Sequence, residues 1–398
     1  MPLDKQKKKL MWAIFIIGLI QMPGLALTPG INRISTTAFA EHSLATIQST
    51  LALSSLTQPV VALCVATLIN RGFVTKKAAI IFGLCLLAVN GVLAILMNTE
   101  FYHLIILSIV LGISTGCFIS NMFGLMFDGF EPVQRQIVTG YQTSFINAGG
   151  IIMSLLGGLM ATYMWYGGYL LLLVGLPAAV FVLFTVPSYK APVRERGEKK
   201  SVGKLNPRIF YYCVITALFM MTYTVCGNNI STHISGIGDS GTAGIAMAFM
   251  MGGGVVSGLF FNKLSGKAGD YSISFAFSAV FVGYLLLSLF PASLPMTIIA
   301  VFVVGMSLSI LLPRCVFMVS TLAEDPSASA TASALVVMAA PSTGAFLSPI
   351  IFTNLTTSLF GESTVPRYRF VGFVALAIAV IIALMTMKAN NNLLKKCA

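Results

Sequence analysis

Long apolar stretches separated by short polar ones run through the whole sequence. The strict alternation that marks β-strands is absent, and each stretch of about 20 residues is long enough to cross about 30 Å of hydrocarbon as an α-helix. The pattern therefore predicts an all-α membrane protein with about twelve transmembrane helices. We expect them at residues 10–31, 44–69, 78–98, 102–127, 137–162, 166–187, 209–232, 241–262, 271–290, 295–320, 328–357 and 367–388.

Composition supports a membrane protein and gives no sign of an enzyme. Of the 398 residues, 57% are hydrophobic and only 9% are charged, too few to build the polar surface of a soluble protein of this size. The seven cysteines are scattered without a CxxC pair, so we expect no disulfide framework, no metal site and no cofactor. No HExxH motif or paired intramembrane aspartates are present, and we expect no catalytic residues.

The longest polar interruption predicts a linker. It covers residues 188–208 and would separate an N-terminal six-helix bundle (1–187) from a C-terminal one (209–398). When successive loops are assigned to alternate sides, twenty of the 24 Lys and Arg residues fall on one side together with this linker and both termini. By the positive-inside rule, that side is cytoplasmic, in a multi-pass protein of a plasma membrane such as the bacterial inner membrane. The net charge of +12 thus reflects topology and does not indicate nucleic-acid binding.

The two halves of the sequence echo each other weakly at offsets close to half the chain length. Such internal repeats are typical of secondary transporters, which bind small molecules within the bilayer. The pattern predicts two pseudo-symmetric six-helix halves. We expect the protein to work as a monomer. The clearest pairs are Glu131-Pro132 with Asp325-Pro326, and Asn70-Arg71 with Asn262-Lys263.

Short motifs next to three predicted helices carry a family resemblance. Basic loops follow the second and eighth helices, as ATLINRGFVTKK (66–77) and GLFFNKLSGK (258–267), and FEPVQRQ precedes the fifth. Together with the six-plus-six topology, they resemble the major facilitator superfamily of transporters over essentially the whole chain. Asparagine stands where that family usually has aspartate in both loops, so we expect fewer ion pairs at the cytoplasmic gate. The resemblance implies gating roles for Asn70, Arg71, Arg135, Asn262 and Lys263.

The same resemblance implies that the first, fourth, seventh and tenth helices line a central cavity. One cavity residue is unusual, since Arg314 lies within the apolar run LSILLPRCVFMVS (308–320). A guanidinium at the bilayer centre costs at least about 2.5–3.5 kcal/mol. All twelve acidic residues fall outside the predicted helix centres, so an anionic substrate is the expected source of negative charge. The expected substrate contacts are Gln21, Thr28, Asn32, Ser120, Asn121, Tyr223, Asn228, Asn229, Ser309 and Arg314.

These observations predict secondary or facilitated transport of a small organic anion, a carboxylate with an apolar part, by alternating access. Uniport or exchange is expected, because no protonatable side chain falls at mid-membrane. An alternative is an exporter of lipophilic, drug-like compounds in which Arg314 is structural. Ser108 stands where drug/proton antiporters carry arginine, and NAGGIIMSLLGG (147–158) lacks their proline, so the common drug/proton mechanism is not favoured. A receptor or scaffold with the same fold is a third possibility.

Overall fold

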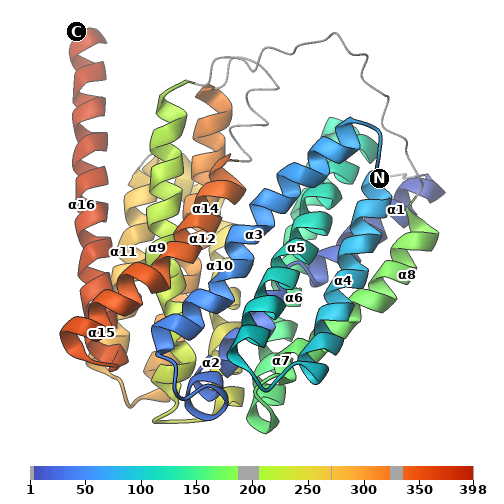
Figure 1. Cartoon of the computed structure of the whole chain (residues 1–398). Coiled ribbons are helices and arrows are strands. Elements are labelled where there is room, and N and C mark those ends of the chain that lie inside the picture. The colour runs from blue at the N-terminus through green and yellow to red at the C-terminus, as the bar shows by residue number, and fades with distance from the viewer. Residues whose placement is uncertain (1–3, 187–205, 270, 323–334, 398) are drawn as a thin grey trace. The chain divides into compact units, whose positions relative to one another are not determined.

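The computed structural model describes residues 4–186, 206–269, 271–322 and 335–397. These residues form helices, with no strand among them (Figure 1). Eleven of the helical segments in this part of the chain are long and apolar enough to cross a membrane. The prediction of an all-α, multi-pass membrane protein is therefore confirmed. Most of the predicted linker 188–208 lies outside the described residues.

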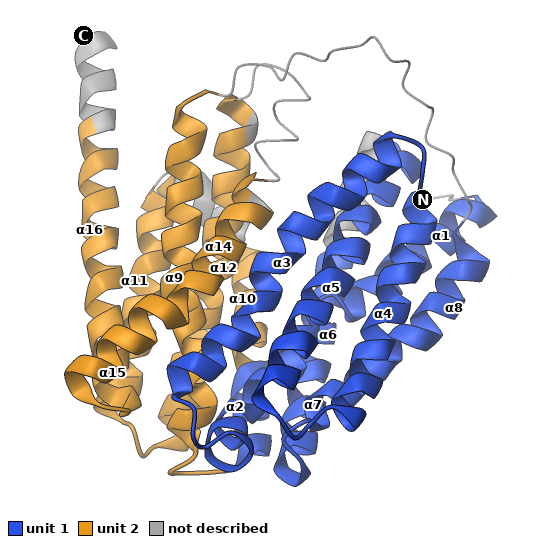
Figure 2. Ribbon diagram, viewed as in Figure 1, with its two compact units in different colours: residues 1–199, 239–248 blue, residues 200–238, 249–398 orange. Residues whose placement is uncertain are grey.

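The chain forms two compact units (Figure 2). Unit 1 comprises Met1–Lys199 and Asp239–Ala248, and unit 2 comprises Lys200–Gly238 and Phe249–Ala398. The short segment Asp239–Ala248 belongs to unit 1 because it packs closely on another helix of that unit. A Cβ atom added to Gly158 would lie 2.8 Å from the Cα of Gly244, so these two helices meet backbone to backbone.

In unit 1, the helices begin and end at residues that explain their bounds. Ser43 and Thr75 cap two of them by accepting hydrogen bonds from the N–H groups of Thr46 (3.2 Å) and Ala78 (3.1 Å). Gly72, two residues after the helix that ends at Asn70, lies in the left-handed region (φ 78°). The elements are α1 (Lys5–Leu19), η1 (Pro23–Ala26), η2 (Thr28–Gly30), α2 (Ile31–Arg33), η3 (Ile34–Ala38), α3 (Leu44–Asn70), α4 (Lys76–Leu96), α5 (Phe101–Gly129), α6 (Pro132–Tyr163), α7 (Gly167–Leu170), η4 (Leu171–Val174) and α8 (Gly175–Thr185).

Helix α5 lies beside α3 and α4 in unit 1 (Figure 1). Its contact with α3 depends on glycine, because a Cβ atom added to Gly116 would lie 2.6 Å from the carbonyl oxygen of Gln58. Small residues at such crossings let membrane helices approach closely and gain van der Waals contact. Arg33 lies on α2 and donates hydrogen bonds to the carbonyls of Thr162 and Tyr163, which end α6. A cation at this position complements the helix dipole.

In unit 2, α9 packs against α12, α14 and α16, and α11 packs against α12 and α16. The crossing of α14 on α9 again requires a glycine, since a Cβ atom added to Gly344 would lie 2.1 Å from the carbonyl oxygen of Ala217. The elements are α9 (Arg208–Ile234), α10 (Ser240–Ala268, of which the residues up to Ala248 belong to unit 1), α11 (Tyr271–Leu289), α12 (Leu294–Leu322), η5 (Leu335–Ala339), α14 (Ala340–Ser348), η6 (Pro349–Thr353), α15 (Asn354–Phe360) and α16 (Thr364–Cys397).

Two predicted boundaries differ from the structure. The sequence predicted the eighth helix to end at Asn262, but α10 continues to Ala268, and Gly269 (φ 52°) follows the helix. The span predicted at 328–357 lies partly outside the described residues. From Leu335 to Phe360, it consists of the shorter segments η5, α14, η6 and α15, with π-helical turns at η5 and η6. Pro341 and Pro349 each remove a backbone donor here, which favours a broken helix.

Candidate substrate-binding site

The first membrane span of unit 1 is a broken helix. After α1 ends, two short 3₁₀ turns follow, each with a proline at its first or second residue, Pro23 and Pro29. Proline cannot donate to the helical ladder, so the regular hydrogen-bond pattern stops there. Discontinuous membrane helices of this kind form the substrate sites of many transporters. The predicted contacts Gln21, Thr28 and Asn32 all lie in or beside this break.

The three residues differ in which of their polar groups already have hydrogen-bond partners within the protein. The Thr28 hydroxyl donates to the carbonyl of Gly24 (3.0 Å). Asn32 is half-buried, and it is the main-chain carbonyl of this residue that accepts a hydrogen bond from the Ser35 hydroxyl (2.9 Å). Gln21 Oε1, by contrast, is buried without a hydrogen-bond partner among the described residues. A buried amide oxygen without a donor is costly, so Gln21 is the side chain of this group best suited to a ligand.

Helix α5 carries the other two candidates of unit 1. Asn121 is buried and donates from Nδ2 to the carbonyl of Cys117 one turn earlier (2.7 Å). Ser120, next to it, is half-buried. The amide of Asn121 is therefore anchored to its own helix, and Ser120 is the more accessible of the two.

Three candidates of unit 2 lie on α9. Tyr223 is buried with its ring stacked on Phe219 (centroids 5.6 Å apart), and its hydroxyl has no partner within the described part of the chain. Asn228 is half-buried. Asn229 is fully buried; its Nδ2 donates to the carbonyl of Val225 (2.9 Å), and its Oδ1 accepts from an arginine. Both polar groups of Asn229 thus have protein partners.

Ser309 and Arg314 lie on α12, which packs against α9. Both side chains are half-buried. The guanidinium of Arg314 lies 5.4 Å from the centre of the Phe317 ring, a cation–π contact one turn along the helix. Pro313 directly precedes it within the helix, which weakens the ladder at this point. The structure therefore brings the unit 2 candidates onto two neighbouring helices.

A second arginine is more deeply buried, and the sequence analysis missed it. Arg367 is the first residue of the helix predicted at 367–388, and it lies in the first turn of α16 with 0% exposure. Its guanidinium donates to Asn229 Oδ1 (2.5 Å), Thr356 Oγ1 (2.9 Å) and Thr357 Oγ1 (2.8 Å). All three partners are uncharged. The only sequence signal was an arginine within one helical turn of a long apolar run.

The predicted gating residues are only partly described. Asn70 and Arg71 are exposed where α3 ends. The side chains of Arg135, Asn262 and Lys263 lie outside the described part of the structure, although Asn262 and Lys263 fall within α10 and not in the predicted loop. Their gating roles stay predictions.

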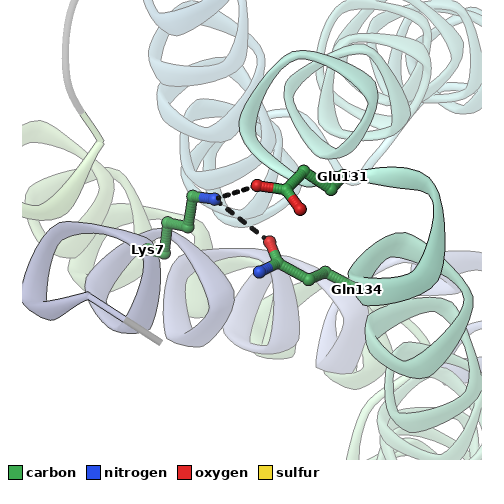
Figure 3. Close-up of polar contacts among 3 residues, drawn as sticks. All are labelled: Lys7, Glu131 and Gln134. Carbon is green, nitrogen blue, oxygen red and sulfur yellow. Dashed lines mark hydrogen bonds and ion pairs between the residues drawn. The ribbon is translucent and has the colours of Figure 1, made fainter. Parts of the chain in front are cut away.

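Ion pairs do form at the end of unit 1 where α1 begins, through residues the sequence analysis did not assign to gating. Lys76 at the start of α4 pairs with Asp128 at the end of α5 (2.6 Å). Lys7 on α1 reaches Glu131 (3.5 Å) and Gln134 (3.1 Å) at the start of α6 (Figure 3). These pairs tie four helices of unit 1 together. A cavity of about 340 Å³ lies beside them, lined by Asp4, Gln6, Lys7, Leu10, Asp128, Gly129, Phe130 and Glu131.

Broken and proline-containing membrane helices that carry buried amides, a tyrosine and arginines define a multi-pass transport protein. The sequence comparison agrees: the family model of the Major Facilitator Superfamily matches residues 10–349. The chain belongs to this superfamily. The predicted family is thereby confirmed, and with it a protein that sits in a lipid bilayer and binds small-molecule substrates. No curated protein matches the chain in sequence.

Solved structures share the fold at low sequence identity. The nucleoside transporter NupG, as a D323A mutant, gives a TM-score of 0.70 at 14% identity and covers 95% of this chain and 99% of its own. A bacterial homologue of the human lysosomal transporter Spinster gives 0.67 at 15%, covering 96% of each chain. The POT family transporter PepTSo gives 0.78 at 11%, covering 98% of this chain and 99% of its own. At these identities the likeness establishes the fold alone.

Proposed function

We propose that this transporter moves a small organic anion, a carboxylate with an apolar part, by alternating access and by uniport or exchange. Arg314 is the proposed contact for the carboxylate. Gln21, Thr28, Asn32, Ser120, Asn121, Tyr223, Asn228, Asn229 and Ser309 are the proposed polar surroundings. We also propose that the protein works as a monomer in a plasma membrane such as the bacterial inner membrane.

The observation that carries the proposal is the sign of the charges inside the membrane spans. Arg314 and Arg367 lie within two of the eleven described spans, whereas none of the chain's acidic residues falls inside those spans. A cation in a low-dielectric interior favours an anionic ligand, because the attraction between charges is strong there. Of the two, Arg314 is the better contact, since it is half-buried while Arg367 is fully enclosed.

The chemistry at Arg314 suits a carboxylate attached to an apolar group. A guanidinium can bind both carboxylate oxygens through parallel N–H groups, which fixes orientation as well as charge. Phe317 beside it offers an apolar face for the rest of the substrate. The substrates in the names of the similar structures do not refine this class, because those proteins are only 11–15% identical to this chain.

Counterflow in proteoliposomes tests the proposal. Vesicles are loaded with unlabelled phenylacetate and diluted into radiolabelled phenylacetate at equal pH on both sides, with the membrane potential clamped. We expect label to accumulate transiently. Arg314→Ala should raise the half-saturating concentration at least about tenfold, the effect of one lost charged hydrogen bond. Arg314→Lys should retain weak activity, since the charge stays and the bidentate geometry is lost. Arg369→Ala, at an exposed arginine, is the matched control.

Three outcomes would count against the proposal. Unchanged affinity in Arg314→Ala would make this arginine structural. Counterflow of a neutral lipophilic drug, but of no carboxylate, would favour the alternative exporter. A loss of exchange in Asp128→Asn, with the unfolding temperature unchanged, would indicate that a protein-borne proton takes part. Asp128 already pairs with Lys76, so we expect exchange in that variant to be unaffected.

A further inference from the structure

A tyrosine hydroxyl from α11 is inserted into the backbone hydrogen bonding of α9. Tyr284 Oη accepts a hydrogen bond from the N–H of Cys226 (2.8 Å) and donates one to the carbonyl of Thr222 (2.5 Å). These two backbone groups are four residues apart, so they are the pair that a regular α-helix joins directly. The hydroxyl therefore competes with the helix for both groups of this turn.

The ring of Tyr284 is held firmly enough to keep the hydroxyl in this position. The whole side chain is 0% exposed, and the ring packs against that of Tyr368 on α16 (centroids 5.2 Å apart). Tyr368 in turn packs against His233 near the end of α9 (5.4 Å). The hydroxyl of Tyr368 itself has no hydrogen-bond partner in the described residues, so Tyr284 is the tyrosine of this pair that acts on the backbone.

The bridged turn lies next to the candidate binding residues. Tyr223 directly follows Thr222, and Asn228 and Asn229 lie within one turn after Cys226. A change in the backbone between 222 and 226 would rotate the residues that follow it. Tyr284 is therefore placed to affect the direction of these candidate side chains, although α11 itself contributes none of them.

We propose that Tyr284 is a positioning residue for the transport site. Its hydroxyl holds open the α9 turn between Thr222 and Cys226 and makes that turn the hinge at which α9 bends. The proposal rests on alternating access by the transporter and is independent of the class of substrate.

The physical reason is the cost of breaking a backbone hydrogen bond within a bilayer. Without water to replace it, an unpaired N–H or C=O group costs several kcal/mol, so an ordinary turn resists bending. In the turn bridged by Tyr284, two hydrogen bonds, one on each side of the hydroxyl, link the N–H of Cys226 to the carbonyl of Thr222. The distance between these groups can change while both stay bonded to the hydroxyl. Insertion of a side chain into the ladder is a recognised cause of helix bending.

Hydrogen–deuterium exchange read by mass spectrometry tests the hinge on the full-length protein and needs no ligand. In the wild type, the peptide covering Thr222–Asn229 should exchange faster than the preceding α9 peptide covering Cys213–Phe219. In Tyr284→Phe, the ring stays and the hydroxyl is lost, so the turn closes on itself. Exchange of the first peptide should then slow about fivefold, because the Cys226 N–H bonds directly to the Thr222 carbonyl and the turn no longer opens as a hinge. Tyr368→Phe, in the same buried cluster, should change nothing.

The rate of phenylacetate counterflow is the second readout, and we expect it to fall in Tyr284→Phe. Faster or unchanged exchange in Tyr284→Phe would overturn the proposal, because a purely structural tie loosens when it is cut. Uniform exchange along α9 in the wild type would overturn it as well, even if the variant failed to fold. Slower exchange with an unaltered counterflow rate would refute the positioning role. If the wild type moves no phenylacetate, the substrate proposal fails and the exchange test stands alone.

Discussion

At the scale of single residues, Arg314 and Arg367 differ in how the protein accommodates them. Arg367 is enclosed and satisfied by three neutral oxygens from α9 and α15. Arg314 is half-buried and lies against the face of an aromatic ring. Arg367 thus acts as a tie between helices, while Arg314 is the more accessible of the two cations.

Replacing Arg367 by leucine tests its role as a tie. The change leaves the side-chain oxygen of Asn229 buried without its donor, which costs about 1–3 kcal/mol. We expect the protein in detergent to unfold at a lower temperature than the wild type by a corresponding amount. Arg369→Leu, two residues away and exposed, removes the same charge without these contacts and should leave the unfolding temperature unchanged. Equal unfolding temperatures for the two variants would contradict the proposed role.

At the scale of helices, the sequence predicted those features that depend on neighbouring residues alone, namely the positions of the membrane spans and some of the helix ends. The membrane spans followed from apolar length alone, because the thickness of the bilayer fixes how long a helix must be. The end of α3 was also predictable, since Gly72 follows directly after Arg71 and adopts positive φ. The prediction of a corresponding loop at Lys263 was wrong. No helix-ending signal stands next to that residue, and α10 continues to Ala268.

Contacts between helices that are far apart along the chain are not marked by any local sequence pattern. The partners of Arg367 lie 10, 11 and 138 residues away along the chain. Tyr284 is 58 residues from Cys226 and 62 from Thr222, its two partners on α9. No periodicity or motif marks such pairs, so the sequence indicated a role for neither Arg367 nor Tyr284.

The start of α10 offers a test at this scale that depends on pH. Asp239 Oδ1 accepts hydrogen bonds from the N–H and the hydroxyl of Thr242, both 2.8 Å long. These bonds lower the pKa of Asp239 below its usual value. A carboxyl whose folded pKa is depressed stabilises the fold above its ordinary pKa of about 3.9 and loses that contribution as the pH falls through the folded value.

The unfolding temperature of the wild type should therefore fall more steeply below about pH 4 than that of Asp239→Asn, which keeps a capping oxygen but cannot be protonated. Glu362→Gln, in an exposed turn, serves as the control and should follow the wild type. Parallel curves for the wild type and Asp239→Asn would show that the capping carboxylate has no part in acid sensitivity.

At the scale of the whole molecule, the sequences of the two predicted halves echo each other weakly. The first span of unit 1 is interrupted at Pro23 and Pro29, and α9, the first span of unit 2, accepts the hydroxyl of Tyr284 into its backbone hydrogen bonding. Both spans carry proposed substrate contacts. Internal repeats of this kind are typical of secondary transporters, in which one repeat moves largely as a rigid body against the other.

The orientation of the molecule in the membrane is the last prediction, and it follows from charge. Twenty of the 24 basic residues fall on the side of the linker and both termini, and retention of Lys and Arg on the cytoplasmic side is the strongest determinant of topology. Single cysteines introduced at Ser201 in the linker and at Ser363 between α15 and α16 report the two sides, with the exposed Cys64 replaced by serine. An impermeant maleimide applied to intact cells should label position 363 and not 201, and permeabilised cells should label both. The reverse pattern in intact cells would invert the topology and place the ion pairs of Lys7 and Lys76 at the outer surface.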